Sequence, residues 1–198
     1  DTYNRPISDL GVSLLAQCNF RCTYCMPERE FHSEYQFLKK HQRLSHEEIF
    51  RVVKIAVELG VTKVRLTGGE PLLDKNISKL INLISQVEEI EDLALTTNGV
   101  LLRKHANDMM KAGLHRITIS LDSIDEVIFN KMNGNRASVR EVLDGIEAAE
   151  NAGFEKIKIN SVIQRGVNDD FIVNLLDHFR GTGHIVRLIE FMDVGTQN

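Results

Sequence analysis

The sequence predicts an α/β protein built as an incomplete (β/α)6 parallel barrel. Short runs of β-branched and aliphatic residues alternate with amphipathic helical patterns along the whole chain. Strands separated by helices pair in parallel through right-handed crossovers. Six such units fall short of the eight that close a full barrel. With 198 residues, 42% of them hydrophobic, the chain is expected to form one globular domain over residues 1–198.

The first half of the chain is expected to supply three strands and three helices. Ser45 and Glu48 form a capping box ahead of apolar residues at helical spacing, and Gly60 ends that helix. A long connection over residues 17–44 precedes it. In chain order, we predict strands at 12–16, 61–66 and 93–97, and helices at 45–59, 77–87 and 101–112.

The second half of the chain repeats the same alternation. Ser138 and Glu141 make a second capping box, and Asn168 is expected to cap the last helix. We predict strands at 116–121, 156–163 and 185–191, a short helix at 126–132, and longer helices that begin at 138 and after 168.

Composition and charge exclude several classes of protein. Lys and Arg total 24 and Asp and Glu total 28, a net charge of −4 without a basic patch, which argues against nucleic-acid binding. No apolar run approaches the roughly 18 residues of a membrane-spanning helix. Three closely spaced cysteines make a poor disulfide framework, so we expect a reducing, cytoplasmic compartment.

The three cysteines form the pattern Cys18-x-x-x-Cys22-x-x-Cys25 in the connection after the first strand. Thiolates at this spacing can converge on one soft metal centre. In a 4Fe-4S cluster, three thiolates would leave one iron open for an outside ligand. A structural zinc site, with His32 as a fourth ligand, remains the alternative. The position after the first strand of an incomplete parallel barrel favours the cluster.

The cysteine pattern, with Tyr24 before the last cysteine, resembles the radical S-adenosylmethionine (SAM) superfamily. Within it, longer blocks resemble the GTP 3′,8-cyclase family, lyases that carry out the first step of molybdenum cofactor biosynthesis. Six blocks occur in family order, at residues 19–27, 63–71, 96–99, 120–123, 158–160 and 187–192. Together they extend over nearly the whole chain.

The resemblance implies that Cys18, Cys22 and Cys25 hold a 4Fe-4S cluster, with SAM chelating the open iron. The residues expected to contact SAM are Tyr24, Gly69, Glu70, Ser120 and Met192.

Each of these SAM contacts has a physical rationale. Gly69 lets a backbone approach closely, Glu70 can accept a bond from the SAM ammonium, and the Ser120 hydroxyl can bond the ribose. Met192 can pack its polarizable sulfur on adenine. A turn glycine, a solvated carboxylate, a strand hydroxyl and core packing are the respective alternatives.

The substrate implied by the resemblance is GTP. Arg65 and Lys158 would bind its triphosphate, Thr96 would add a hydroxyl contact, and Lys63 and Arg187 are further candidates. A charged residue facing a barrel interior is costly unless it is paired, which favours a bound anion. Strand alternation also permits outward-facing positions, because Lys63 and Arg65 share one face.

The chain departs from the family pattern in three places. Gly11 stands where the family usually has Arg, and Leu15-Ala16-Gln17 replaces Thr-Asp/Glu-Arg. The family's C-terminal region, with three more cysteines for a second cluster, has no counterpart here, so we expect a fragment. Another radical SAM enzyme and a SAM- or cluster-binding module without turnover are the alternatives. An electron donor is an expected partner, and a homodimer is left open.

Overall fold

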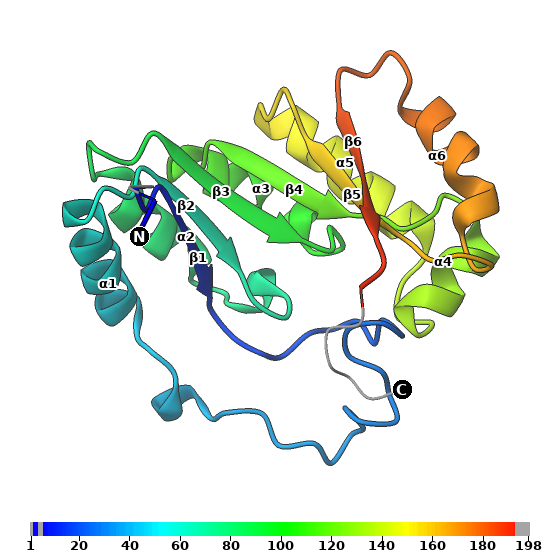
Figure 1. Cartoon of the computed structure of the whole chain (residues 1–198), viewed down its shortest axis with the longest axis horizontal. Helices are drawn as coiled ribbons and strands as arrows, with labels where there is room; N and C mark the ends of the chain where they lie inside the picture. Colours follow the sequence, from blue (N-terminus) through cyan, green and yellow to red (C-terminus); the bar gives the residue numbers. More distant parts are fainter. Residues whose placement is uncertain (1, 4–5, 193–198) are drawn as a thin grey trace.

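The computed structural model describes residues 2–3 and 6–192, which fold around a six-stranded parallel sheet (Figure 1). The strands lie in sequence order, β1-β2-β3-β4-β5-β6, so each crossover joins nearest neighbours. Within the described residues, β1 and β6 are the two edges of this sheet. The strands are β1 Asp9–Ser13, β2 Lys63–Thr67, β3 Asp92–Thr97, β4 Arg116–Ser120, β5 Lys158–Ile163 and β6 Ile185–Glu190. The predicted α/β class and parallel topology are confirmed.

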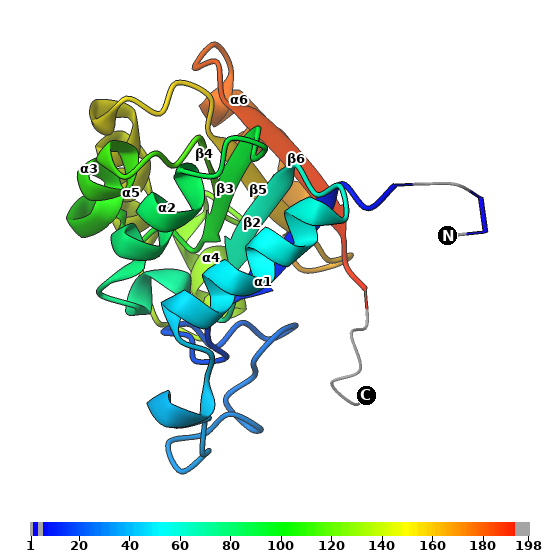
Figure 2. The same ribbon diagram turned by 90° about the vertical axis from the view of Figure 1, so that its left-hand side faces the viewer.

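The helices pack on one face of the sheet and leave the other face without a helical layer, as two perpendicular views show (Figures 1 and 2). We call the uncovered side the open face. No described helix combines the length and the apolar character that crossing a membrane requires. The helices are α1 His46–Glu58, α2 Ile77–Ser85, α3 Leu102–Lys111, α4 Glu126–Asn133, α5 Val139–Ala152 and α6 Ile172–Phe179.

Strand alternation separates an apolar layer from a polar one. Val64 and Leu66 in β2, like Leu93 and Leu95 in β3, are fully buried against the helices. The residues between them in sequence point to the open face, because successive side chains of a strand face opposite ways. The hydrophobic core therefore lies between sheet and helices, and the polar residues of the strands gather on the open face.

The predicted capping boxes are both present. The Ser45 and Ser138 hydroxyls accept bonds from the backbone N–H groups of Glu48 and Glu141, whose side chains bond back. Residue Gly153 closes α5 in the left-handed conformation, with φ of 105°. Serine caps thus fix where these two crossover helices begin.

Most elements begin or end within two residues of the prediction, and the largest shift is at β1. It covers residues 9–13 rather than 12–16, with Asp9 in register with Lys63 and Ser13 with Thr67. Asn168 does not cap a helix. Its buried side-chain amide donates to the carbonyl oxygens of Asp122 and Val162, and a short 3-10 turn precedes α6.

We predict that Gly145→Ala destabilises the fold by about 1–3 kcal/mol, through overpacking at the contact of α5 with the end of β3. A Cβ on Gly145 would lie 2.2 Å from the Gly99 carbonyl oxygen. Helix propensity alone predicts the opposite sign, a gain of up to about 1 kcal/mol. Urea unfolding measures the difference.

The matched control is Gly11→Ala, because a Cβ there meets nothing within 4 Å. An unchanged or raised unfolding midpoint for Gly145→Ala would show that the two segments are not in close contact.

Candidate active site

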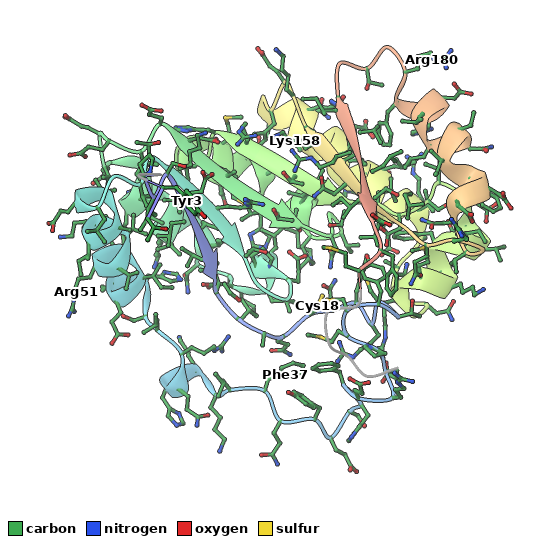
Figure 3. The ribbon with its side chains drawn as sticks, in the orientation of Figure 1. Tyr3, Cys18, Phe37, Arg51, Lys158 and Arg180 are labelled. Atoms are coloured by element: carbon green, nitrogen blue, oxygen red, sulfur yellow. The ribbon has the colours of Figure 1, made fainter. Side chains whose placement is uncertain are left out.

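The carboxyl ends of all the parallel strands lie at the same end of the sheet, and Cys18 lies there too (Figure 3). The cysteine loop follows β1, and the segment 68–71 follows β2. Asn98 and Asp122 follow β3 and β4. Ligands of open α/β sheets bind at the carboxyl ends of the strands, and the candidate site lies there.

The segment after β2 lies directly against the chain that leads to the cysteines. The Leu14 N–H donates to the Thr67 carbonyl oxygen at 2.9 Å, and the Glu70 N–H donates to that of Gln17 at 2.9 Å. A Cβ on Gly69 would lie 2.3 Å from the Gln17 carbonyl oxygen. The close approach expected at Gly69 is thus made to the protein's own backbone. Its contact with SAM remains a prediction.

Glu70 is buried, with 1% of its surface exposed, so the alternative of a solvated carboxylate is wrong. Its Oε1 accepts from Leu72 N at 3.0 Å and from Thr97 Oγ1 at 2.7 Å, while Oε2 accepts from Asn98 N at 2.8 Å. Burial raises the pKa of Glu70, and the bonds from Asn98, Thr97 and Leu72 oppose that rise. Because both oxygens already have donors, Glu70 braces the ends of β2 and β3. We did not foresee this role.

The cysteine loop docks on the end of α4. The backbone N–H groups of Arg21 and Thr23 donate to the carbonyl oxygens of Asn133 and Met132, both at 3.0 Å. The Arg21 guanidinium donates to the Cys18 and Phe31 carbonyl oxygens, both at 2.8 Å. No role for Arg21 was predicted from the sequence. Its position between Cys18 and Cys22 could have indicated that it supports the cysteine loop.

Tyr24 ties the same loop to β4 and β5. Its hydroxyl donates to Asp122 Oδ2 at 2.7 Å, and Asp122 Oδ1 accepts from Val162 N at 2.9 Å. Burial raises the pKa of Asp122 to about 6, against these two bonds, which lower it. The Tyr24 hydroxyl is thus hydrogen-bonded within the protein. The contact of Tyr24 with SAM remains a prediction, and the rest of the side chain would have to make it.

The three thiols are free, with Cys18 and Cys22 half-buried and Cys25 exposed. Burial raises the pKa of each, and at Cys22 the Asp122 carboxylate and the other two cysteines raise the pKa further. These mutual effects mean that the three sulfurs share one region. Bound iron would replace the thiol protons, as metal ions do at coordinating thiols.

Three cysteine thiols are the protein ligands that a 4Fe-4S cluster takes when one iron is left open. Among residues 2–3 and 6–192, no three His, Cys, Asp or Glu side chains are placed to hold one metal ion. A cluster takes one thiolate at each of three separate irons. The Phe20 N–H lies 3.4 Å from Cys18 Sγ and suits an anionic thiolate there.

Next to the cysteine loop, the open face carries groups suited to a ribose. Ser120, Asn160 and Arg187 lie in one row across β4, β5 and β6. Asn160 Oδ1 is buried and has no hydrogen-bond partner, which is costly unless a ligand donates to it. We did not single out Asn160 from the sequence. Met192 lies just beyond β6 with 66% of its surface exposed, so the core-packing alternative is wrong.

Cations gather on the open face, with Lys63 and Lys158 at the amino ends of their strands. Lys63 and Arg65 lie on the same face of β2, and Lys158 on β5 pairs in register with Thr118, the neighbour of Thr96. Burial lowers the pKa of Lys158, and Arg116, Arg187 and Arg65 lower it further. Arg65, Lys158 and Arg187 therefore share one electropositive region, although Arg65 and Arg187 are exposed rather than enclosed in a barrel interior.

A separate cavity of about 1000 Å³ lies between the start of α1 and the start of α2. Its lining includes Gln17, His46 and Asp74, with His46 Nε2 2.6 Å from Asp74 Oδ2. None of the three cysteines and none of the open-face cations lines it. It is therefore distinct from the candidate site.

Comparison with known proteins agrees with this geometry. The profile of the Radical SAM superfamily matches residues 12–179. The chain belongs to the radical SAM superfamily. Two solved structures share the fold: methylornithine synthase (TM-score 0.70, 19% identity, covering 96% of this chain and 55% of that one), and native anSMEcpe with bound AdoMet (TM-score 0.71, 21% identity, covering 98% and 54%).

Curated relatives within the superfamily are more similar in sequence. The GTP 3′,8-cyclase of Xanthomonas axonopodis pv. citri (strain 306) is 52% identical over all 198 residues, which cover 59% of that protein. The GTP 3′,8-cyclase of Staphylococcus epidermidis (strain ATCC 12228 / FDA PCI 1200) is 47% identical, with 58% covered. The radical SAM chain thus spans somewhat more than half the length of these relatives.

We predict that Glu70→Gln lowers the stability of the chain by about 1–3 kcal/mol. A glutamine amide would turn its NH2 toward at least one of the three groups that now donate to the carboxylate. Urea unfolding measures the change. Glu89→Gln, at an exposed position, is the matched control, and equal midpoints for the two variants would rule out the bracing role.

Proposed function

We propose that this chain is the radical SAM core, residues 1–198, of a GTP 3′,8-cyclase. The observation that carries the proposal is the division of the open face. The three thiols belong to the loop that follows the carboxyl end of β1, and Ser120 is the last residue of β4, in register with Asn160. Lys63, Arg65 and Lys158 lie nearer the amino ends of their strands on the same face, and Arg187 lies in register with Asn160. SAM and a nucleotide triphosphate could therefore bind side by side. The similarity to full-length GTP 3′,8-cyclases supports the same conclusion.

Cys18, Cys22 and Cys25 would hold a 4Fe-4S cluster with SAM on its open iron. With an external electron donor, cluster and SAM supply the radical chemistry that joins the GTP ribose carbon 3′ to guanine carbon 8. The chain's own residues bind and orient. Ser120 and Asn160 would hold the SAM ribose from neighbouring strands, and the bond from Tyr24 to Asp122 keeps the cysteine loop against the sheet.

The triphosphate would bind where the cations gather. Arg65, Lys158 and Arg187 repel one another, and a bound anion would offset this repulsion. Lys63 adds a fourth positive charge on the same face. Charge-assisted bonds to phosphate oxygens are among the stronger hydrogen bonds in proteins. Thr96 lies in the row of Thr118 and Lys158 and can add a hydroxyl.

One observation favours a second candidate, a module that binds cluster and SAM without cyclising GTP. Gly11 pairs in register with Arg65 on the open face, and a Cβ there would meet nothing within 4 Å. An arginine at this position, usual in the family, would fit and would add a phosphate contact. Its absence weakens the triphosphate site without touching the SAM end.

We predict that Cys25→Ala abolishes reductive cleavage of SAM. Anaerobic reconstitution of the unaltered chain should load about one 4Fe-4S cluster, measured as iron and acid-labile sulfide. With one thiolate missing, a second iron loses its protein ligand. Production of 5′-deoxyadenosine under strong reductant is the readout, and Thr23→Ala, an exposed neighbour in the same loop, is the control. Full cleavage by the Cys25 variant would contradict the assignment.

We predict that Arg65→Ala weakens GTP binding by about 1.5–3 kcal/mol and leaves SAM binding nearly unchanged. Calorimetry on the reconstituted chain measures both affinities. Arg51→Ala removes an exposed arginine from α1, away from the open face, and should change neither (Figure 3). If Arg65→Ala weakened SAM and GTP equally, a folding defect would explain the result instead.

A further inference from the structure

The geometry points to Arg116 as a further phosphate-binding residue of the open face, held in its binding orientation by Asp92. Arg116 would bind the polyphosphate directly, and Asp92 would be a positioning residue that acts through it. This inference rests on the proposed function, because it adds to the same triphosphate site. Neither residue was expected from the sequence to have a role.

Arg116 lies in the same row of the sheet as Arg65. The register pairs Arg65 with Ala94 and Ala94 with Arg116, so one small residue separates the two arginines. Two strand spacings put their backbones about 9–10 Å apart. Long arginine side chains that start this far apart can grip one polyphosphate from both sides, and the methyl group of Ala94 leaves the space between them free.

The pair of Arg116 and Asp92 leaves part of the guanidinium available. Arg116 Nε donates to Asp92 Oδ1 at 2.7 Å, and Nη2 donates to Asp92 Oδ2. Nη1 takes no part in this two-bond pair, and a guanidinium has five N–H donors in a fixed fork. Of the two side chains, Arg116 is the more exposed, 38% against 20% for Asp92, so its guanidinium is the one that a ligand can reach.

The surroundings of the Arg116–Asp92 pair carry an excess of positive charge, which favours binding of an anion. Arg65, Arg116 and Arg187 all lower the pKa of Lys158, which Asp92 alone raises. Three arginines and one carboxylate thus lie near Lys158, so positive charges outnumber negative ones around it. Asp92 neutralises part of this charge and holds Arg116 in place against the repulsion of its neighbours. The remaining charge suits a ligand with several phosphates better than one with a single phosphate.

The test compares binding of GTP and GMP, by calorimetry, to the reconstituted chain and its variants. We expect Arg116→Ala to weaken GTP binding about tenfold or more, as the loss of a charge-assisted contact does, and GMP binding much less. We expect Asp92→Asn to weaken GTP binding as well. The loss of a negative charge alone would tighten the binding of an anion. Weaker GTP binding by Asp92→Asn would therefore show that Asp92 acts by orienting Arg116.

The double variant Asp92→Asn/Arg116→Ala should bind GTP no more weakly than Arg116→Ala, because Asp92 acts through the missing arginine. Wild-type affinity in the double variant would overturn the inference, since Arg116 would then serve only to neutralise Asp92. Tighter binding by Asp92→Asn would overturn the positioning role. The control Arg103→Ala/Asp144→Asn removes a surface Arg–Asp pair from α3 and α5 and should change nothing.

Arg65→Ala separates this inference from the function on which it rests. If Arg65→Ala weakens GTP binding and Arg116→Ala does not, the role of Arg116 is wrong and the triphosphate site stands. If neither variant weakens it, the triphosphate site itself is wrong.

Discussion

The contact between two backbone segments, residues 14–17 and 68–70, supports the whole candidate site. A side chain at Gly68 or Gly69 would overlap backbone atoms of Leu15, Ala16 or Gln17, so only glycines allow this contact. It extends the pairing of β1 with β2 past the end of both strands and delivers Cys18 to the edge of the sheet. Glu70 then joins this contact to the end of β3. The position of the first thiol is therefore set by strand pairing rather than by the loop itself.

The open face is divided electrostatically along the strands. At the carboxyl ends of the strands lie two buried carboxylates and the three thiols. Burial raises the pKa of Asp122, Glu70 and the cysteines, which favours the neutral form of each group. Farther down the strands, cations dominate, with Asp92 as the counter-charge of Arg116. A bound polyphosphate would meet groups of the opposite charge there. One sheet can hold both because its helices all cover the opposite face.

Much of the architecture follows from local sequence, whereas several site contacts do not. Capping boxes at Ser45 and Ser138 and the alternation of strands and helices are local signals, and both were predicted correctly. Period-two alternation also places Lys63 and Arg65 on one face of β2. The sequence did not predict roles for Asn160, Arg116 and Asp92. Their roles depend on which residues lie in register across strands, and no short motif encodes that register.

The bracing role of Glu70 was not predicted, and the prediction that Asn168 caps a helix was wrong, for a related reason. Each residue bonds backbone groups that follow distant strands, and no local pattern reveals such contacts. The three cysteines were the strongest signal, because their spacing alone brings the thiols to one region.

The central claim is that SAM and GTP occupy two ends of one open face at the same time. Titration of GTP into the reconstituted chain, with and without saturating SAM, tests it most directly. We expect one GTP to bind per chain in both conditions, with similar affinity, and far more tightly than GMP. Displacement of GTP by SAM, or equal affinities for GTP and GMP, would contradict the account.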